Sequence, residues 1–344
     1  MPETLAIPPR RCPARRIGHA AAWLSTACMP LWAGCLSLTP LPDEAPVVEQ
    51  TDRTTGRGYY LYVPSTYSAR RAWPLVVACH GTRPYDTAMY ETREWAKFAE
   101  KEGILVVAPD LLGTKGDFPP SPDRQIALQR RDEEAILSIV RSIKGRYRVA
   151  EEQVFMAGWS AAAYAILHTG LSHPDVFRAL VIRQGTFDER FLDFPEDALD
   201  RWQPILIIYG RTDFLRDQTL ACIEWLRQRG QYVETLEIPG SHRRIDPKRP
   251  WKFFQSVVRE RPWIRIRARV PKRSEPRTVT FRVDAIPEAD QLMWFFGDGT
   301  HSRDATPAHT YAEPGDYTVT VNVGLVVGKK YRRQRVVRVG SARD

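Results

Sequence analysis

The chain has 344 residues, of which 43% are hydrophobic and 26% are charged, a composition typical of a globular protein rather than a disordered or collagen-like one. The length predicts two domains, or one large domain with an appendage. The formal net charge of +9 is unevenly distributed, because residues 1–35 carry +3, residues 261–344 carry +7 and residues 36–260 carry −1. A nucleic-acid-binding protein places its positive charge over its main domain, so this distribution predicts no nucleic-acid partner.

The first 35 residues have the pattern of an export signal, with a basic stretch and then an apolar run that ends at Cys35. A Pro-rich, acidic linker follows at residues 36–56. The end of the run, "LWAGC", resembles a bacterial lipobox, although Trp32 stands where a lipobox usually has an aliphatic residue. We therefore interpret residues 1–35 as a lipoprotein leader with Cys35 as the lipidated residue, in preference to an ordinary secretory signal or an uncleaved anchor helix. The protein is expected to be exported, either as a cell-envelope lipoprotein or in secreted or periplasmic form.

Cys79 and Cys222 are the cysteines that remain beyond the leader. One lies in a predicted strand and the other in a predicted helix, both apolar, so we expect two buried free thiols rather than a disulfide. The sequence has no CxxC or HExxH motif, and its histidines lack ligand spacing. We therefore predict no metal site and no cofactor.

The middle of the chain alternates strands and helices with short connections. In chain order, we predict an entry strand in "YYLYVPSTY", a strand in "WPLVVACHG", a helix in "REWAKFAEKEG", a strand in "ILVVAPD", a helix in "DEEAILSIVRSIKGRY", a strand in "QVFMAG", a helix in "AAAYAILHTG", strands in "ALVIRQG" and "PILIIYG", a helix in "QTLACIEWLRQRG", a strand in "YVETLEIPG" and a helix in "PWKFFQSVVRE". Continuous apolar strands are typical of a mostly parallel, doubly wound α/β sheet covered by helices on both faces. In such a sheet, the chemistry lies at the carboxyl ends of the strands.

A candidate catalytic triad follows three of these strands. Ser160 lies after "VFMA" in a GxSxA turn that leads into a helix, an arrangement that exposes the hydroxyl above the sheet. Asp213 follows "LIIYG" and His242 follows "LEIPGS". The order Ser, Asp, His is that of the α/β-hydrolase topology. We expect His242 to take the proton of Ser160 and Asp213 to orient the imidazole; Asp217, near the same strand end, is the alternative acid.

An oxyanion hole requires two backbone N–H donors near the serine. The loop after "VVAC" reads His80-Gly81-Thr82-Arg83, and we assign the donors to Thr82 and to Ala161, the residue after the nucleophile. His80 is expected to brace the loop rather than to titrate in the reaction. An insertion over residues 113–124, "GTKGDFPPSPDR", is a candidate lid.

With these motifs in place, residues 57–260 resemble the α/β-hydrolase esterases grouped with polyhydroxybutyrate depolymerases and feruloyl or acetylxylan esterases. The resemblance rests on "YYLYVPSTY", "PLVVACHGT", "ILVVAPD", "VFMAGWSAAA", "PILIIYGRTDF" and "IPGSH". It implies ester hydrolysis through an acyl-serine without a cofactor. Those esterases more often have GxSAGG where this chain has Ala162 in a GxSxA turn, which leaves the substrate open.

From residue 263 the pattern changes to short alternating strands, such as "IRIRARV", "TVTFRVDA" and "YTVTVNV", separated by turn signals. This pattern predicts an all-β sandwich over residues 263–340, after a catalytic domain at 57–262. The segment "WFFGDGT…TPAHTYAEPGDYTVTV" resembles the polycystic kidney disease (PKD) repeat, an immunoglobulin-like module. The resemblance implies an extracellular adhesion or spacer domain, in which Asp298 and His309 are turn and packing residues. The residues that match the repeat are Trp294, Phe296, Gly297, Asp298, Gly299, His309, Tyr311, Pro314, Gly315 and Tyr317.

Cationic side chains alternate along two strands of this module: Arg265, Arg267 and Arg269 on the first, and Lys330, Arg332 and Arg335 near the last. We favour a solvated strand face with protected edges. The alternative is a basic patch that binds an anionic envelope polymer or lipid headgroups.

Together these features predict an exported, lipid-anchored or secreted serine esterase, a carboxylic-ester hydrolase acting on an acylated polysaccharide or a polyester. The alternatives are a peptidase of the same fold and an envelope binding protein whose hydrolase domain is inactive.

Overall fold

The structure is a computed structural model that describes residues 46–114, 121–193, 199–270 and 275–340. The predicted leader with Cys35, residues 36–45 of the predicted linker and the central part of the predicted insertion lie outside the described residues. Within the described ranges, no helix has the length and apolar character needed to cross a membrane.

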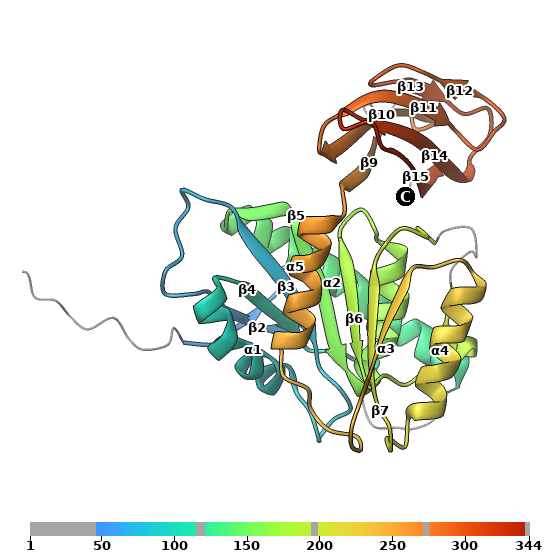
Figure 1. Cartoon of the computed structure of the whole chain (residues 1–344). Coiled ribbons are helices and arrows are strands. Elements are labelled where there is room, and N and C mark those ends of the chain that lie inside the picture. The colour runs from blue at the N-terminus through green and yellow to red at the C-terminus, as the bar shows by residue number, and fades with distance from the viewer. Residues whose placement is uncertain (1–45, 115–120, 194–198, 271–274, 341–344) are drawn as a thin grey trace, which may run out of the picture. The chain divides into compact units, whose positions relative to one another are not determined.

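An eight-stranded sheet with the order β1-β2-β4-β3-β5-β6-β7-β8 forms the first part of the described chain (Figure 1). Strand β2 pairs antiparallel with β1 and with β4, and all the other neighbours are parallel. The mostly parallel sheet predicted from the continuous apolar strands is therefore confirmed. The strands are β1 Val48–Thr51, β2 Gly58–Tyr62, β3 Trp73–Cys79, β4 Leu105–Pro109, β5 Val149–Trp159, β6 Ala179–Arg183, β7 Ile205–Gly210 and β8 Val233–Ile238.

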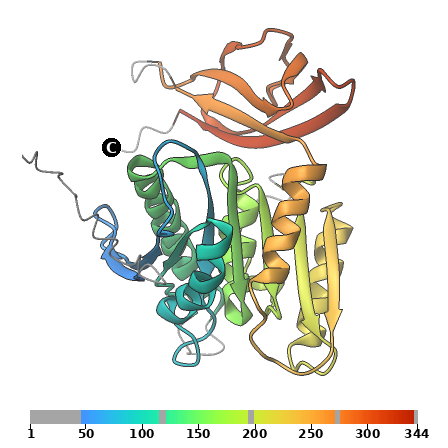
Figure 2. The same ribbon diagram turned by 60° about the vertical axis from the view of Figure 1, so that its left-hand side comes forward.

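Helices cover both faces of this sheet. The helices α1 (Ala88–Glu102) and α5 (Lys248–Glu260) bury Trp95 and Phe254 against one face, together with Val76 of β3. Figure 2 shows these two helices, teal and orange, on the same side of the sheet. The helices α2 (Pro122–Arg146) and α4 (Arg216–Gln228) pack on the other face, in a core that contains Leu75. Successive side chains of a strand point to opposite faces, so a strand covered on both sides is apolar throughout.

Three helices differ from the sequence-based expectation. Helix α1 begins at Ala88, five residues before the predicted start. Helix α2 begins at Pro122, ten residues before the predicted start, so residues 122–124 belong to a helix rather than to the predicted insertion. The Ser121 side chain caps this helix by accepting the N–H of Arg124, and Pro at the first helical position has its φ already fixed near the helical value. The predicted helix after the nucleophile is irregular, with a 3-10 turn η1 (Ser160–Ala162), a short α3 (Ala163–Ala165) and a π-helical η2 (Ile166–Gly170).

The two cysteines are placed as predicted. Cys79 ends β3 and Cys222 lies in α4, and both are buried and free. Burial raises the pKa of each thiol above its ordinary value, which is the behaviour of packed rather than reactive cysteines.

The second part of the described chain is a β-sandwich of two antiparallel sheets, ordered β13-β10-β9 and β12-β11-β14-β15. Trp294, Phe281 and Tyr311 are buried between them. His309 stacks on Phe296 with ring centroids 4.2 Å apart and contacts Asp298 at 2.6 Å, so both predicted turn and packing residues serve the local structure. The strands are β9 Trp263–Arg269, β10 Thr278–Ile286, β11 Ala289–Phe295, β12 His301–Ser302, β13 Ala308–Thr310, β14 Gly315–Leu325 and β15 Lys330–Val339.

The cationic side chains of the sandwich do not form one uniform face. Arg265 is buried and contacts Glu151 and Asp284 at 2.8 and 3.2 Å. Arg267 pairs with Asp284, and Arg335 pairs with Asp175. The members of the predicted face that are exposed without a described ion pair are Arg269, Lys330 and Arg332.

Candidate active site

Ser160 directly follows β5 and is the first residue of η1, in a strained turn. Its φ is 57°, in the left-handed region that residues with a side chain rarely adopt. The turn is tightly packed, since a Cβ at position 158 would lie 2.5 Å from the Cβ of Ala162. Gly158 is therefore required here, and the strained backbone carries the Ser160 hydroxyl above the end of the sheet, as a nucleophile elbow does.

The structure brings together the three side chains of the predicted triad. The Oγ of Ser160 lies 3.1 Å from the Nε2 of His242. The Nδ1 of His242 lies 3.1 Å from each carboxylate oxygen of Asp213. When Nδ1 carries the proton, its N–H donates a hydrogen bond to the carboxylate. Nε2 then has a free lone pair and can accept a hydrogen bond from the serine hydroxyl. The alternative acid, Asp217, lies on α4 with its side chain 99% exposed, and has no described contact with His242.

The predicted oxyanion loop passes beside the nucleophile. A Cβ on Gly81 would lie 3.3 Å from the Cβ of Ser160, so the backbone of this loop and the serine are in contact. The N–H of Gly81 donates to the Oδ2 of Asp86 at 2.7 Å. Since this N–H is engaged, the N–H of Thr82 is the next donor along the loop, and Thr82 and Ala161, the second residue of η1, stay the predicted oxyanion donors.

His80 braces the oxyanion loop from within the fold. It is fully buried; its Nε2 accepts the N–H of Leu111 at 2.9 Å, and its Nδ1 lies 2.8 Å from the carbonyl oxygen of Gly81. One ring nitrogen accepts and the other donates, which describes a neutral imidazole. Burial lowers the pKa of His80 to about 4, so this ring stays neutral near pH 7.

Two aromatic side chains enclose the ring of His242. Trp159 stacks on it with ring centroids 4.8 Å apart, and Phe214 lies at 4.7 Å with a tilted ring. Trp159 is buried, whereas Phe214 is 76% exposed. The outer face of Phe214 is therefore an apolar surface directly beside the candidate base.

Several polar residues around the triad were not predicted from the sequence. Arg183, at the end of β6, is fully buried and pairs with Glu91 and Glu94 of α1. Arg244 pairs with Glu91 and with Asp86. Burial raises the pKa of Glu91 to about 7, against the lowering effect of the two arginines. Polar residues at the carboxyl end of an apolar strand, as in "ALVIRQG", are the signal that could have identified this cluster.

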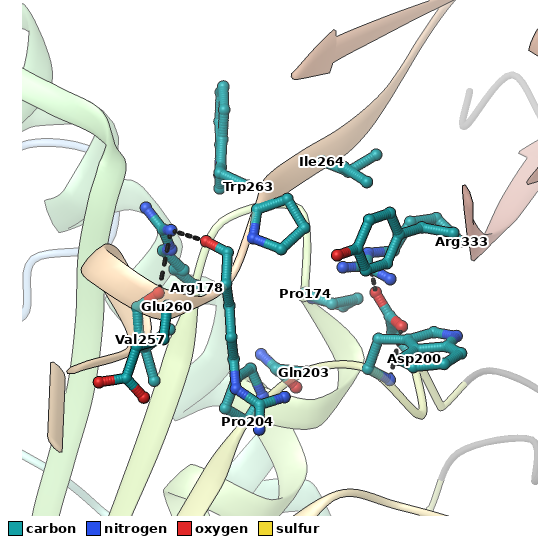
Figure 3. Close-up of a pocket in the computed structure, with 14 residues that line it drawn as sticks. Pro174, Arg178, Asp200, Gln203, Pro204, Val257, Glu260, Trp263, Ile264 and Arg333 are labelled. Carbon is teal, nitrogen blue, oxygen red and sulfur yellow. Dashed lines mark hydrogen bonds and ion pairs between the residues drawn. The ribbon is translucent and has the colours of Figure 1, made fainter. Parts of the chain in front are cut away.

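The structure also has a pocket of about 380 Å³, which Figure 3 shows with its lining residues. Its lining includes Trp202, Trp263, Tyr331, Asp200 and Arg333, and none of the predicted triad or oxyanion residues. Over the described ranges, no three His, Cys, Asp or Glu side chains gather closely enough to hold a metal ion.

The sheet order, the helices on both faces and the strained serine turn together define an α/β-hydrolase fold. A solved CE1 ferulic acid esterase from Anaeromyces mucronatus, in the absence of substrate, matches this chain with a TM-score of 0.50. The two are 19% identical, and the match covers 61% of this chain and 88% of that one. At this identity the likeness concerns the fold alone.

Known sequences match separate parts of the chain. The family model of the PKD domain matches residues 260–339, in agreement with the resemblance of the C-terminal strands. A probable acetylxylan esterase A from Aspergillus clavatus is 26% identical over 135 residues, which are 39% of this chain and 43% of that protein. Collagenase ColA from Bacillus cereus is 47% identical over 47 residues, which are 14% of this chain and 5% of that protein. The chain thus spans less than half the length of these curated relatives.

Proposed function

We propose that this chain is a serine hydrolase that cleaves carboxylic esters, with Ser160 as nucleophile, His242 as base and Asp213 as the group that orients it. The observation that carries the proposal is the continuous hydrogen-bonded series from Ser160 through His242 to Asp213, at 3.1 Å for each contact. The positive φ of Ser160 supports the same role, because such strain clusters at functional sites. The sequence match to a protein named as a probable acetylxylan esterase favours an ester over a peptide.

The geometry suits acyl transfer in two steps. In the first, His242 takes the proton of Ser160 while Oγ attacks the ester carbonyl carbon, and the N–H groups of Ala161 and Thr82 donate to the resulting oxyanion. The protonated imidazole then gives its proton to the departing alcohol oxygen, which leaves an acyl-serine. In the second step, water attacks the acyl carbon, His242 takes the water proton, and Ser160 recovers its own as the acid departs.

The first experiment compares turnover of p-nitrophenyl acetate by residues 40–344 with that of Ser160→Ala. Loss of the nucleophile should lower kcat by roughly 10⁴-fold or more, and a fluorophosphonate should label the wild type but not the variant. Ser172→Ala is the matched control, since Ser172 donates only to the carbonyl oxygen of His168. Equal turnover by wild type and Ser160→Ala would refute the esterase proposal and leave an inactive envelope binding protein.

We further assign the substrate to acylated polysaccharides or polyesters. An open apolar surface beside the base, at Phe214, suits an ester carried on a polymer better than one enclosed in a deep pocket. Acetate release from acetylated xylan, acid release from a polyester film and cleavage of a peptide p-nitroanilide compare the candidates directly. Preferential cleavage of the anilide would point to a peptidase instead.

Export with lipid attachment at Cys35 completes the proposal, on the sequence pattern alone. Cys35→Ser should abolish incorporation of radiolabelled palmitate and leave esterase turnover unchanged. The exposed cations Arg269, Lys330 and Arg332 are the residues through which the sandwich would contact an anionic envelope surface. Such binding should weaken with added salt, because exposed charges are screened.

A further inference from the structure

Gln184 is a buried residue with an unusual backbone at the edge of the candidate site. It directly follows β6, has no exposed surface, and has a φ of 49°. Among the described residues other than glycine, only Ser160 shares such a positive φ. The N–H of Gln184 donates to the carbonyl oxygen of Ile208 at 2.7 Å. The neighbouring strand β7 therefore holds this strained conformation in place.

The side chain of Gln184 contacts the chain on both sides of His242. Its Nε2 donates to the carbonyl oxygen of Ser241 at 2.8 Å, and its Oε1 accepts the N–H of Arg243 at 2.9 Å. The same oxygen lies 3.4 Å from the Nε1 of Trp159, whose ring stacks on His242. A carboxamide offers a donor and an acceptor at one group, so a single side chain can satisfy both neighbours of the histidine.

The loop that carries His242 is irregular, so its geometry depends on side-chain contacts such as those of Gln184 and of Arg244. Residues 239–246 form neither helix nor strand, and Gly240 has a φ of 101°. No strand ladder therefore supports the histidine backbone. Space for the amide is provided by Gly210, because a Cβ there would lie 2.8 Å from the Nε2 of Gln184 and 2.5 Å from the carbonyl oxygen of Gly240.

We propose that Gln184 is a positioning residue, which holds the backbone on both sides of His242 so that Nε2 stays within hydrogen-bonding distance of Ser160. The proposal rests on the catalytic role given to His242 above. Gln184 acts through residues 241 and 243 and takes no part in proton transfer. Displacement of a reacting group by about 1 Å can cost on the order of a hundredfold in rate, so this contact matters to kcat more than to substrate binding.

The variants Gln184→Ala and Gln184→Glu separate the two hydrogen bonds. Alanine removes both. Glutamate keeps an acceptor for Arg243 but turns a carboxylate oxygen toward the carbonyl of Ser241. We expect kcat for p-nitrophenyl acetate to fall roughly 10- to 100-fold in Gln184→Ala with KM changed less than threefold. Gln184→Glu should lose at least as much kcat, because its buried carboxylate faces the carbonyl oxygen of Ser241 without a donor.

Gln231→Ala is the matched control for a merely structural role. Gln231 is also buried, and its Nε2 also donates to two backbone carbonyls, those of Asp200 and Gln203, away from the triad. This variant should lower Tm as much as Gln184→Ala does, with kcat within twofold of the wild type. If Gln231→Ala shows the same fall in kcat as Gln184→Ala for the same fall in Tm, the positioning role is refuted.

Two measurements decide the proposal without turnover. Amide exchange of peptides covering residues 240–246 should accelerate in Gln184→Ala and not in Gln231→Ala, because Gln184 binds the N–H of Arg243. A crystal structure of Gln184→Ala should show the His242–Ser160 distance lengthened beyond hydrogen bonding. Unchanged exchange and an unchanged distance would overturn the proposal. A wild type without Ser160-dependent turnover would instead refute the proposed function, while exchange and the crystal structure still decide whether Gln184 holds the loop.

Discussion

Arg244 and Asp86 join the loop of the candidate base to the loop of the candidate oxyanion hole. The Nη1 of Arg244, two residues after His242, lies 2.6 Å from the Oδ1 of Asp86. The other carboxylate oxygen of Asp86 accepts the N–H of Gly81 at 2.7 Å. Asp86 is fully buried, so its charge needs this partner. The ion pair therefore couples the two segments that the proposed acyl transfer requires at a fixed separation.

Replacement of Arg244 should impair both stability and catalysis. Arg244→Ala leaves Asp86 and Glu91 buried without one of their cations, which should lower the free energy of unfolding by on the order of 2 kcal/mol or more. Movement of the oxyanion loop should lower kcat by roughly 10- to 100-fold. Arg244→Lys should fall between, because an ammonium cannot span both carboxylates as a guanidinium does. Urea unfolding and ester turnover measure the two effects.

The control for this prediction is Arg211→Ala, which removes an exposed pair with Glu237. It should change the unfolding free energy by less than about 0.5 kcal/mol. If Arg244→Ala behaves like Arg211→Ala, the ion pair does not couple the two loops.

Phe214 should affect the choice of acyl or alcohol group rather than the fold. Its side chain is 76% exposed beside the ring of His242, so an apolar substrate group can bury area against it. Phe214→Ala should lower kcat/KM for p-nitrophenyl butyrate about fivefold, corresponding to about 1 kcal/mol of lost apolar contact, and less for the acetate. Tm should not change. Equal losses for both esters would mean that Phe214 acts only by packing on the imidazole.

The sequence predicted the parts of the site that depend on local pattern. Buried parallel strands are continuous apolar runs, so their carboxyl ends could be located, and Ser160 and Asp213 each follow one of them. His242 follows β8, an edge strand in which apolar and polar residues alternate. The start of α2 at Ser121-Pro122 was missed, although a serine cap followed by proline is a helix-start signal. Pro119 and Pro120 directly precede this signal, and a Pro-rich segment is typical of a loop.

The supporting contacts could not be predicted in the same way. Gln184 and Arg243 are 59 residues apart, and Arg244 and Asp86 are 158 apart. No local periodicity records which polar side chains meet across such separations; that depends on the order of strands in the sheet. The charged residues of the sandwich strands illustrate the same limit: the sequence does not show that Arg265 is buried and forms ion pairs with Glu151 and Asp284.

His80 predicts a specific dependence of stability on pH. Its pKa is about 4 in the folded chain because of burial, whereas an unfolded histidine has a pKa of about 6.5. Between these values only the unfolded state binds the proton, so acid favours unfolding and the stabilisation present above pH 6.5 declines as pH falls toward 4. From pH 7 to pH 5 the free energy of unfolding should fall by about 2 kcal/mol because of His80. In His80→Gln the fall in unfolding free energy between pH 7 and pH 5 should be smaller by this contribution, as measured by urea unfolding at both pH values. An equal fall in the two proteins would show that another group is responsible.

Gly158 and Ala162 form a packed pair that explains the GxSxA turn. The methyl group of Ala162 occupies the space that a side chain at position 158 would need, with 2.5 Å between the two Cβ positions. Gly158→Ala should therefore lower the free energy of unfolding by about 2 kcal/mol through overpacking, and it should slow fluorophosphonate labelling of Ser160. Ala162→Gly alone should cost about 1 kcal/mol, for a lost buried methyl and a more flexible backbone.

The double variant Gly158→Ala, Ala162→Gly separates this clash from the other contacts of Gly158. Removal of the Ala162 methyl relieves the closest approach, but the Cβ and carbonyl oxygen of Cys79 remain 3.0 Å from the new Cβ. The double variant should thus be more stable than the sum of the two single losses by at least about 1 kcal/mol, yet less stable than the wild type. Additive losses in urea unfolding would show that the pair is not coupled. A positive coupling would mean that alanine at position 162 is compatible with the strained serine turn because glycine stands at 158.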